Sequence, residues 1–162
     1  MAEPVDIAPA HDRELVLARL MDATPEQLFR AWTSPETYPD WFCPKPWRAE
    51  ATRMELRPGG VSEITMYGPD GEVFPNPGLY LEIEPNRRLV FTDAFGENWV
   101  PTEGGGMMTA VLTFEAQPDG RTLYIARVGH PTVEKMQQHE QMGFHDGWGV
   151  ATDQLEAVAR TL

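Results

Sequence analysis

The side chains able to do acid–base or metal chemistry are spread along the sequence without a recognised catalytic spacing. His139 and Glu140 are followed by His145, a composition similar to that of zinc-binding helices. Ligation from one helix face needs histidines four residues apart, whereas the separation here turns them by about 240°. The sequence therefore predicts no metal site and no cofactor, with these histidines in solvent or at the rim of a pocket.

Nucleophilic side chains are also few. The serines are Ser34, placed to cap a helix, and Ser62, inside an expected strand, and there is no Gly-x-Ser-x-Gly motif. Cys43 lies between aromatic and proline residues, with no base nearby in the sequence. This setting favours a small buried side chain over a catalytic thiol. We assign no catalytic residue from these patterns.

Asp93 is the polar residue best suited to a binding or acid–base role. In an expected strand it shares the phase of Leu89, Phe91 and Phe95. If that face looks inward, the carboxylate enters an apolar interior, where it would serve as an acid or an anchor. Together with His145 it would form the one candidate acid–base pair. The alternative is that strand twist exposes Asp93, or that its carboxylate caps the adjacent loop by hydrogen bonds.

Composition limits the partners and the compartment. The chain has 162 residues and fits one domain, expected over residues 13–162 after a flexible tail of residues 1–12. Its net charge of −12 repels phosphate backbones, so we expect no nucleic acid partner and no anionic membrane partner. A single cysteine, no secretory signal and no long apolar run predict a cytoplasmic protein without membrane insertion.

Turn residues and apolar spacing predict the elements that position these side chains. A first strand is expected over residues 14–21, followed by two short helices at Thr24-Pro25-Glu26 and Ser34-Pro35-Glu36. In both helices a hydroxyl residue at the N-cap precedes a proline at the first helical position. Turns such as Gly68-Pro69-Asp70-Gly71 then separate six more strands. These are expected over residues 49–56, 61–67, 78–84, 88–95, 107–115 and 122–129.

One long loop, residues 96–106, interrupts the tight hairpins. It contains Trp99 and three consecutive glycines, which lack the following helix and lysine of a phosphate-binding loop. Long ordered loops are often functional, so we expect a lid that carries Trp99 over a bound molecule. The alternative is that Trp99 packs permanently on the sheet edge or against a second subunit.

The last element is predicted as one long helix from Thr132 to Leu162. Its apolar stripe has alternating spacings of four and three residues, typical of one helix face. The stripe consists of Phe144, Trp148, Ala151, Leu155, Val158 and Leu162. We expect it to lie on the sheet, with Trp148 and Leu155 buried. Glycines at 143, 147 and 149 indicate either close packing on the sheet or space left for a ligand beside Trp148.

One strand, two short helices, six strands and one long helix predict an α+β fold. The antiparallel sheet of about seven strands must bury one face, and only the C-terminal helix is large enough to cover it. The order therefore implies a curved sheet wrapped around its own C-terminal helix.

Seven segments carry a resemblance to a known family: Phe29-Arg-Ala-Trp-Thr33, Trp41-Phe-Cys-Pro44, Leu56-Arg-Pro-Gly-Gly60, Gly68-Pro-Asp-Gly71, Gly78-Leu-Tyr-Leu-Glu-Ile-Glu-Pro85, Arg88-Leu-Val-Phe-Thr-Asp93 and Gly143-Phe-His-Asp-Gly-Trp148. With them the chain resembles the START-like helix-grip (SRPBCC) superfamily, in the bacterial branch named after the activator of the heat-shock-protein-90 ATPase. The resemblance covers residues 14–162 and implies a cavity between helix and sheet. It implies no particular activity, because the superfamily includes lipid carriers, hormone receptors, polyketide cyclases and co-chaperone domains.

Aromatic and methionine side chains, with two polar residues, are the candidate cavity lining. The expected ligand-binding residues are Trp41, Phe42, Met66, Tyr80, Phe91, Asp93, Trp99, Met108, Phe144, His145 and Trp148. The preferred hypothesis is a non-enzymatic binding protein for a lipid-like or polyketide-like apolar molecule, with homodimer formation left open. Two alternatives stay open: a cyclase- or hydratase-type enzyme using Asp93 and His145, and a co-chaperone-like protein-interaction domain.

Overall fold

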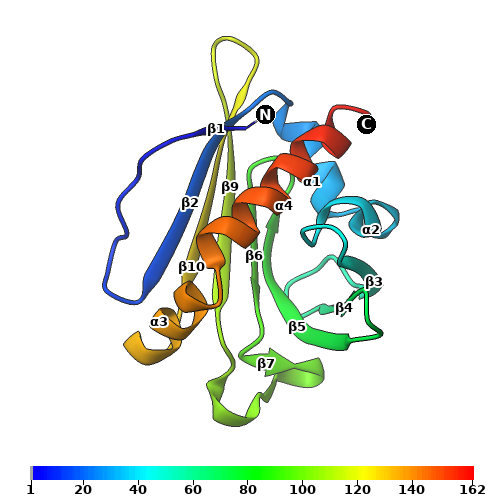
Figure 1. Ribbon diagram of the computed structural model, residues 1–162, viewed down its shortest axis with the longest axis vertical. Helices are drawn as coiled ribbons and strands as arrows, with labels where there is room; N and C mark the ends of the chain where they lie inside the picture. Colours follow the sequence, from blue (N-terminus) through cyan, green and yellow to red (C-terminus); the bar gives the residue numbers. More distant parts are fainter. Residues whose placement is uncertain (1) are drawn as a thin grey trace.

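A helix crosses one face of an antiparallel sheet in the computed structural model, which describes residues 2–162 (Figure 1). Over these residues the sheet has eight strands in the order β1-β2-β10-β9-β6-β5-β4-β3. The strands are β1 (Glu3–Pro4), β2 (Glu14–Met21), β3 (Arg48–Met54), β4 (Val61–Tyr67), β5 (Val73–Glu84), β6 (Arg88–Thr92), β9 (Thr109–Ala116) and β10 (Thr122–Gly129). The helices are α1 (Pro25–Trp32), α2 (Tyr38–Trp41), α3 (Val133–Gln141) and α4 (Phe144–Ala159).

The sheet is built mainly from hairpins between consecutive strands. Strand β3 pairs with β4, β4 with β5, and β5 with β6. At the other side of the sheet, β2 pairs with β10. Register shifts between Ala51 and Arg53 in β3, and between Tyr80 and Glu82 in β5, mark irregularities that bend a strand. The predicted α+β helix-grip fold is confirmed, with α4 lying across the sheet.

Strand β5 is longer than the sequence predicted. It begins at Val73 rather than at residue 78, and Pro75 and Pro77 lie inside it. This first part pairs with β4 alone, because β6 pairs with β5 only from Leu79 onward. Prolines are tolerated where a strand has a free edge, and the prediction treated them as a boundary.

Helix α1 begins as predicted. Thr24 Oγ1 accepts a hydrogen bond from the Gln27 N–H at 3.2 Å, and the Gln27 side-chain oxygen accepts one from the Thr24 N–H at 2.9 Å. This capping box pairs two N–H groups that the helix leaves free. Ser34 is the N-cap of the short 3-10 helix η1 (Pro35–Thr37), but its side chain makes no capping bond.

The C-terminal segment is two helices and not the single helix that was predicted. Helix α3 ends at Gln141 and α4 begins at Phe144, with Gly143 at φ +95° between them. Only glycine adopts this left-handed conformation at little cost, and it turns the chain between the helices. Thr132 caps α3 as predicted, because its Oγ1 accepts from the Lys135 N–H at 3.1 Å. On α4, Leu155 is fully buried, whereas Trp148 is only partly buried.

The segment expected as a flexible tail over residues 1–12 contains a short strand near its start. Glu3 and Pro4 pair with Leu20 and Arg19 of β2, so they extend the sheet by a short edge strand. Ala2 is 4% exposed, and its N–H donates to Asp153 Oδ1 at 3.2 Å. Met1 lies outside the described residues.

The loop expected over residues 96–106 contains a small hairpin of β7 (Phe95–Gly96) and β8 (Val100–Pro101). The 3-10 turns η2 (Glu97–Trp99) and η3 (Glu103–Gly105) complete it. Contacts to other elements hold the hairpin in place. Arg53 of β3 forms an ion pair with Glu97, and Lys135 of α3 donates to the carbonyl of Gly104 at 2.6 Å.

Candidate ligand-binding cavity

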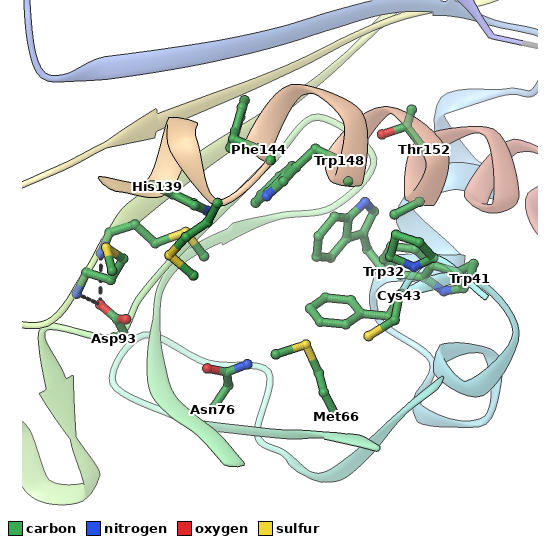
Figure 2. A pocket seen from close by; sticks show the side chains of 18 of the residues that line it. Trp32, Trp41, Cys43, Met66, Asn76, Asp93, His139, Phe144, Trp148 and Thr152 are labelled. Atoms are coloured by element: carbon green, nitrogen blue, oxygen red, sulfur yellow. Dashed lines mark hydrogen bonds between the residues drawn. The ribbon is translucent and has the colours of Figure 1, made fainter. Parts of the chain in front are cut away.

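A cavity of about 400 Å³ lies between α3 and α4, the α1–α2 segment and the sheet (Figure 2). This volume is in the range that holds a drug-sized molecule. The sequence predicted four of its aromatic lining residues: Trp41, Phe42, Phe144 and Trp148. It also predicted Met66, Asp93 and Met108. The structure therefore brings seven of the eleven expected residues to one cavity.

The aromatic wall comes from the end of α1 and from α2. The ring of Trp32 lies 4.7 Å from that of Trp41 and 6.1 Å from that of Phe42, measured between centroids. The Trp41 indole N–H donates to Thr37 Oγ1 at 3.1 Å, and Thr37 Oγ1 donates to the Ala31 carbonyl at 2.7 Å. Because the polar atom of Trp41 is paired inside the protein, this ring presents apolar surface to the cavity.

A second wall is the first half of α4. The rings of Phe144 and Trp148 stack with centroids 5.2 Å apart. Gly147 lies between them in the sequence, and a Cβ added there would meet no atom within 4 Å. A Cβ on Gly149 would instead lie 3.3 Å from Arg19 Nη2. The glycines of this helix thus have different surroundings: Gly147 leaves open space beside Trp148, and Gly149 lies close to a neighbouring side chain.

The sheet contributes one flexible apolar side chain and two polar side chains. Met66 of β4, Asn76 of β5 and Tyr124 of β10 line the cavity. Burial raises the pKa of the Tyr124 hydroxyl, and it raises the pKa of the Cys43 thiol to about 11. Both groups are neutral at pH 7, so Cys43 has the inert character predicted for it.

Asp93 lies at one end of the cavity and holds the chain that returns from the β7–β8 hairpin. Its Oδ1 accepts hydrogen bonds from the N–H groups of Met107 at 2.8 Å and Met108 at 3.0 Å. Gly106 approaches it closely at φ +74°, where an added Cβ would lie 2.5 Å from Asp93 Oδ1. Asp93 therefore caps the loop, which was one of its two predicted roles, and also lines the cavity.

His139 of α3 lies at the same end. Its Nδ1 is 2.8 Å from His130 Nε2, and its ring packs edge-on against that of Phe144 at 5.1 Å. Burial and, to a smaller extent, His130 lower the pKa of His139 from 6.5 to about 4, while Asp93 opposes the shift. The imidazole is therefore neutral at pH 7.

Four predicted residues do not line the cavity. Tyr80 is 2% exposed, in the core, and the Phe91 ring packs on the Trp32 ring at 5.6 Å. Trp99 packs edge-on against Phe95 at 5.7 Å and close to Gly59, so the residue expected in the lid lies elsewhere. Strand phase, which was the argument for Phe91, does not say which part of the inner face stays open.

His145 is also outside the cavity. Its side chain is 57% exposed, and its Nε2 pairs with Glu140 Oε2 at 2.9 Å. The predicted couple of Asp93 and His145 is therefore not formed, and the histidine beside Asp93 is His139. The reason is that α3 and not the start of α4 packs on the segment that Asp93 caps, since Lys135 of α3 donates to the carbonyls of Gly104 and Gly106.

The sequence reasoning also missed Trp32 as a lining residue. Trp32 is the end of the apolar stripe Leu28, Phe29 and Trp32 in α1, which predicted a core position. That signal was correct, since Trp32 is 4% exposed, but the same ring also lines the cavity. Burial in a core and contact with a cavity are not exclusive for a side chain of this size.

The family model described as activator of Hsp90 ATPase homolog 1-like protein matches residues 22–160. This chain belongs to that family. Within the activator of Hsp90 ATPase homolog 1-like family, a solved structure from Nitrosomonas europaea is 36% identical, with 97% of each chain covered and a TM-score of 0.87. A second, from Rhodobacter sphaeroides, is 25% identical, covers 97% of this chain and 99% of that one, and has a TM-score of 0.81.

A third similar structure, from Arthrobacter aurescens, is 25% identical over 93% of this chain and 88% of that one, with a TM-score of 0.79. No curated protein matches the sequence significantly. Within residues 2–162, no helix is long and apolar enough to span a bilayer. In the same part of the chain, no three His, Cys, Asp or Glu side chains are grouped to hold a metal ion.

Proposed function

We propose that this member of the activator of Hsp90 ATPase homolog 1-like family binds a hydrophobic small molecule between α4 and the sheet. The observation that carries the proposal is the cavity of about 400 Å³ with its two aromatic walls. A concave, mostly apolar site with a few polar groups is the usual form of a small-molecule site. The open space at Gly147, where the helix lacks a side chain, supports the same conclusion.

The proposal places a single domain, with the edge strand at Glu3–Pro4 added to the expected residues 13–162, in the cytoplasm. The chain has one cysteine, Cys43, which is buried, and cytoplasmic proteins generally lack structural disulfides. The net charge of −12 disfavours anionic surfaces, so we propose a small apolar molecule as the ligand and neither a membrane nor a nucleic acid.

Tryptophan fluorescence tests the proposal, because Trp32, Trp41 and Trp148 line the cavity. The protein is titrated with fatty acids, flavonoids and polyketide-like aromatics. We expect saturable binding of at least one class by wild type and by Gly149→Ala, with strong loss in Gly147→Leu. Leucine at 147 extends into the open space, whereas the Gly149 variant changes the same helix outside the cavity. Absence of binding across the panel, or equal binding by Gly147→Leu, contradicts the proposal.

A second candidate is a co-chaperone-like interaction with an Hsp90-type ATPase. The family description and the exposed apolar side chains at the start of β5 support it, since Val73 is 55% and Phe74 is 53% exposed. Such exposed apolar surface is typical of protein contacts. Addition of the chain to a bacterial Hsp90 should raise its ATPase rate, and Phe74→Ser should reduce the effect. An unchanged ATPase rate excludes this candidate for that Hsp90.

A further inference from the structure

The positions of the ring protons in the His130–His139 pair follow from the hydrogen-bond geometry. His130 Nδ1 lies 2.9 Å from the Arg13 carbonyl oxygen, which can only accept, so Nδ1 carries a proton. The His130 ring is 4% exposed, and the Arg13 guanidinium donates to the carbonyls of His130 and Pro131 beside it. In the form of His130 with one ring proton, that proton is at Nδ1 and the lone pair is at Nε2.

This lone pair fixes the tautomer of His139. His130 Nε2 accepts, so His139 Nδ1 donates to it across 2.8 Å. The neutral His139 ring then has no proton at Nε2, which is left as a hydrogen-bond acceptor. No described residue donates a hydrogen bond to that atom, and His139 lines the cavity. The two histidines thus present one unused acceptor at this end of the cavity.

Asp93 supplies a second acceptor at the same end. Both backbone N–H groups that bind its carboxylate donate to Oδ1, and no residue in the described part of the chain donates to Oδ2. Figure 2 shows Asp93 and His139 on one side of the cavity, and Trp41 and Cys43 on the other. The cavity therefore has an acceptor-rich end and an aromatic end.

Positive side chains do not balance these acceptors. Among the described residues that line the cavity there is no lysine or arginine. Lys135 is on the same helix as His139, but its ammonium donates to the carbonyls of Gly104 and Gly106. A ligand carboxylate in this cavity would lose its hydration without meeting a cation, and it would lie near the Asp93 carboxylate.

We infer that the cavity selects ligands with an apolar, aromatic body and a hydrogen-bond donor at one end, such as a phenolic or alcoholic hydroxyl, and disfavours carboxylates. The hydroxyl donates to His139 Nε2 or Asp93 Oδ2, and the body lies toward Trp32, Trp41 and Phe42. His130 is a positioning residue that sets the tautomer of His139. This inference rests on the proposed function and names the ligand class of the same site.

Three probes of matched shape test the inference: 4-hydroxybiphenyl, 4-methoxybiphenyl and biphenyl-4-carboxylate. Their dissociation constants are measured by calorimetry at pH 7. One net hydrogen bond corresponds to about threefold to tenfold in affinity, so the hydroxyl compound should bind tighter than the methoxy compound by this factor. The carboxylate should bind weakest. In His139→Asn, whose amide can still donate toward His130 but does not reach the cavity, the hydroxyl preference should shrink.

The outcomes separate this inference from the proposed function. If hydroxyl and methoxy compounds bind equally, or if the carboxylate binds tightest, the cavity binds small molecules but the inferred selection is wrong. If no probe binds, both the selection and the proposed site for such molecules are rejected.

Nitrogen NMR of the ligand-free protein adds a readout that needs no ligand. His139 Nε2 should have the shift of an unprotonated ring nitrogen in wild type, and His130→Phe should produce a mixture of tautomers. A protonated Nε2 in the wild-type protein overturns the inference, whatever the variant does.

Discussion

His139 Nδ1 and His130 Nε2 lie 2.8 Å apart, which joins helix α3 to the end of strand β10. The contact holds the His139 ring between His130 and Phe144, at the cavity that His139 lines. A metal site had been considered for His139 and His145, which are close in sequence. The observed partner, His130, comes from the end of strand β10. The contact orients the neutral imidazole of His139.

The lowered pKa of His139 predicts a specific loss of stability in acid. The ordinary pKa of 6.5 applies to the unfolded chain, and the folded value is about 4. Below pH 6.5 the unfolded chain takes up a proton that the folded chain refuses, so the free energy of unfolding falls until about pH 4. At pH 4.5 this group should cost about 1–2 kcal/mol relative to pH 7, because solvent at the partly exposed ring weakens the effect of burial.

Urea denaturation of wild type and His139→Asn at pH 7 and pH 4.5 isolates this effect, because protonation of the carboxylates lowers the stability of both proteins. On acidification the unfolding free energy of wild type should fall by about 1–2 kcal/mol more than that of His139→Asn. Parallel changes in the two proteins would show that the ring is not held neutral.

Truncation on α4 should separate stability from binding. Leu155 is fully buried, so Leu155→Ala should cost about 2–5 kcal/mol of unfolding free energy and leave the cavity walls in place. Trp148 is partly buried and lines the cavity, so Trp148→Ala should cost less and weaken binding more. Denaturant melts and ligand titrations measure both. The reverse order of stability would show that Trp148 is a core residue.

Alanine at Gly147 should stabilise the protein. Glycine inside a helix costs up to about 1 kcal/mol relative to alanine, and a Cβ at this position meets no atom within 4 Å. We expect a gain of about 0.5–1 kcal/mol in chemical denaturation. Gly149→Ala should gain less, because its Cβ lies 3.3 Å from Arg19 Nη2. A loss of stability in Gly147→Ala would mean that the helix packs more closely there.

Trp99→Ala should leave ligand affinity unchanged. The Trp99 ring packs on Phe95 and lies near Gly59, and the hairpin that carries it is fixed by the ion pair between Arg53 and Glu97. Titration of the same fluorescent or calorimetric probes measures this directly. A large loss of affinity would restore the lid that the sequence suggested.

The fold could be predicted because each signal was local or periodic. The Thr24 cap, the turns with glycine and proline, and the apolar stripe through Leu155 act over a few residues, and their order allows one way to cover the sheet. The errors came from single residues with positional meaning. Gly143 divides the predicted helix just before its apolar stripe begins at Phe144. Pro75 lies in a strand because that part of β5 has a free edge.

The cavity lining could be predicted only in part. Alternation identifies the inner face of a strand, but the distance from that face to the helix decides whether a residue such as Tyr80 is core or cavity wall. Trp41 and Trp148 were identified because large aromatic side chains were the expected lining, and both lie at the cavity. His139 was not, because its role depends on His130, and the contact between them exists only after the chain has folded.

Native mass spectrometry tests the central claim, that this cavity holds an apolar small molecule. Wild type, Gly149→Ala and Gly147→Leu are each incubated with an apolar extract of the native host and then measured under non-denaturing conditions. We expect a one-to-one adduct of the same small molecule on wild type and Gly149→Ala, and the bare chain for Gly147→Leu. Bare chain for all three proteins, or an equal adduct on Gly147→Leu, would contradict it.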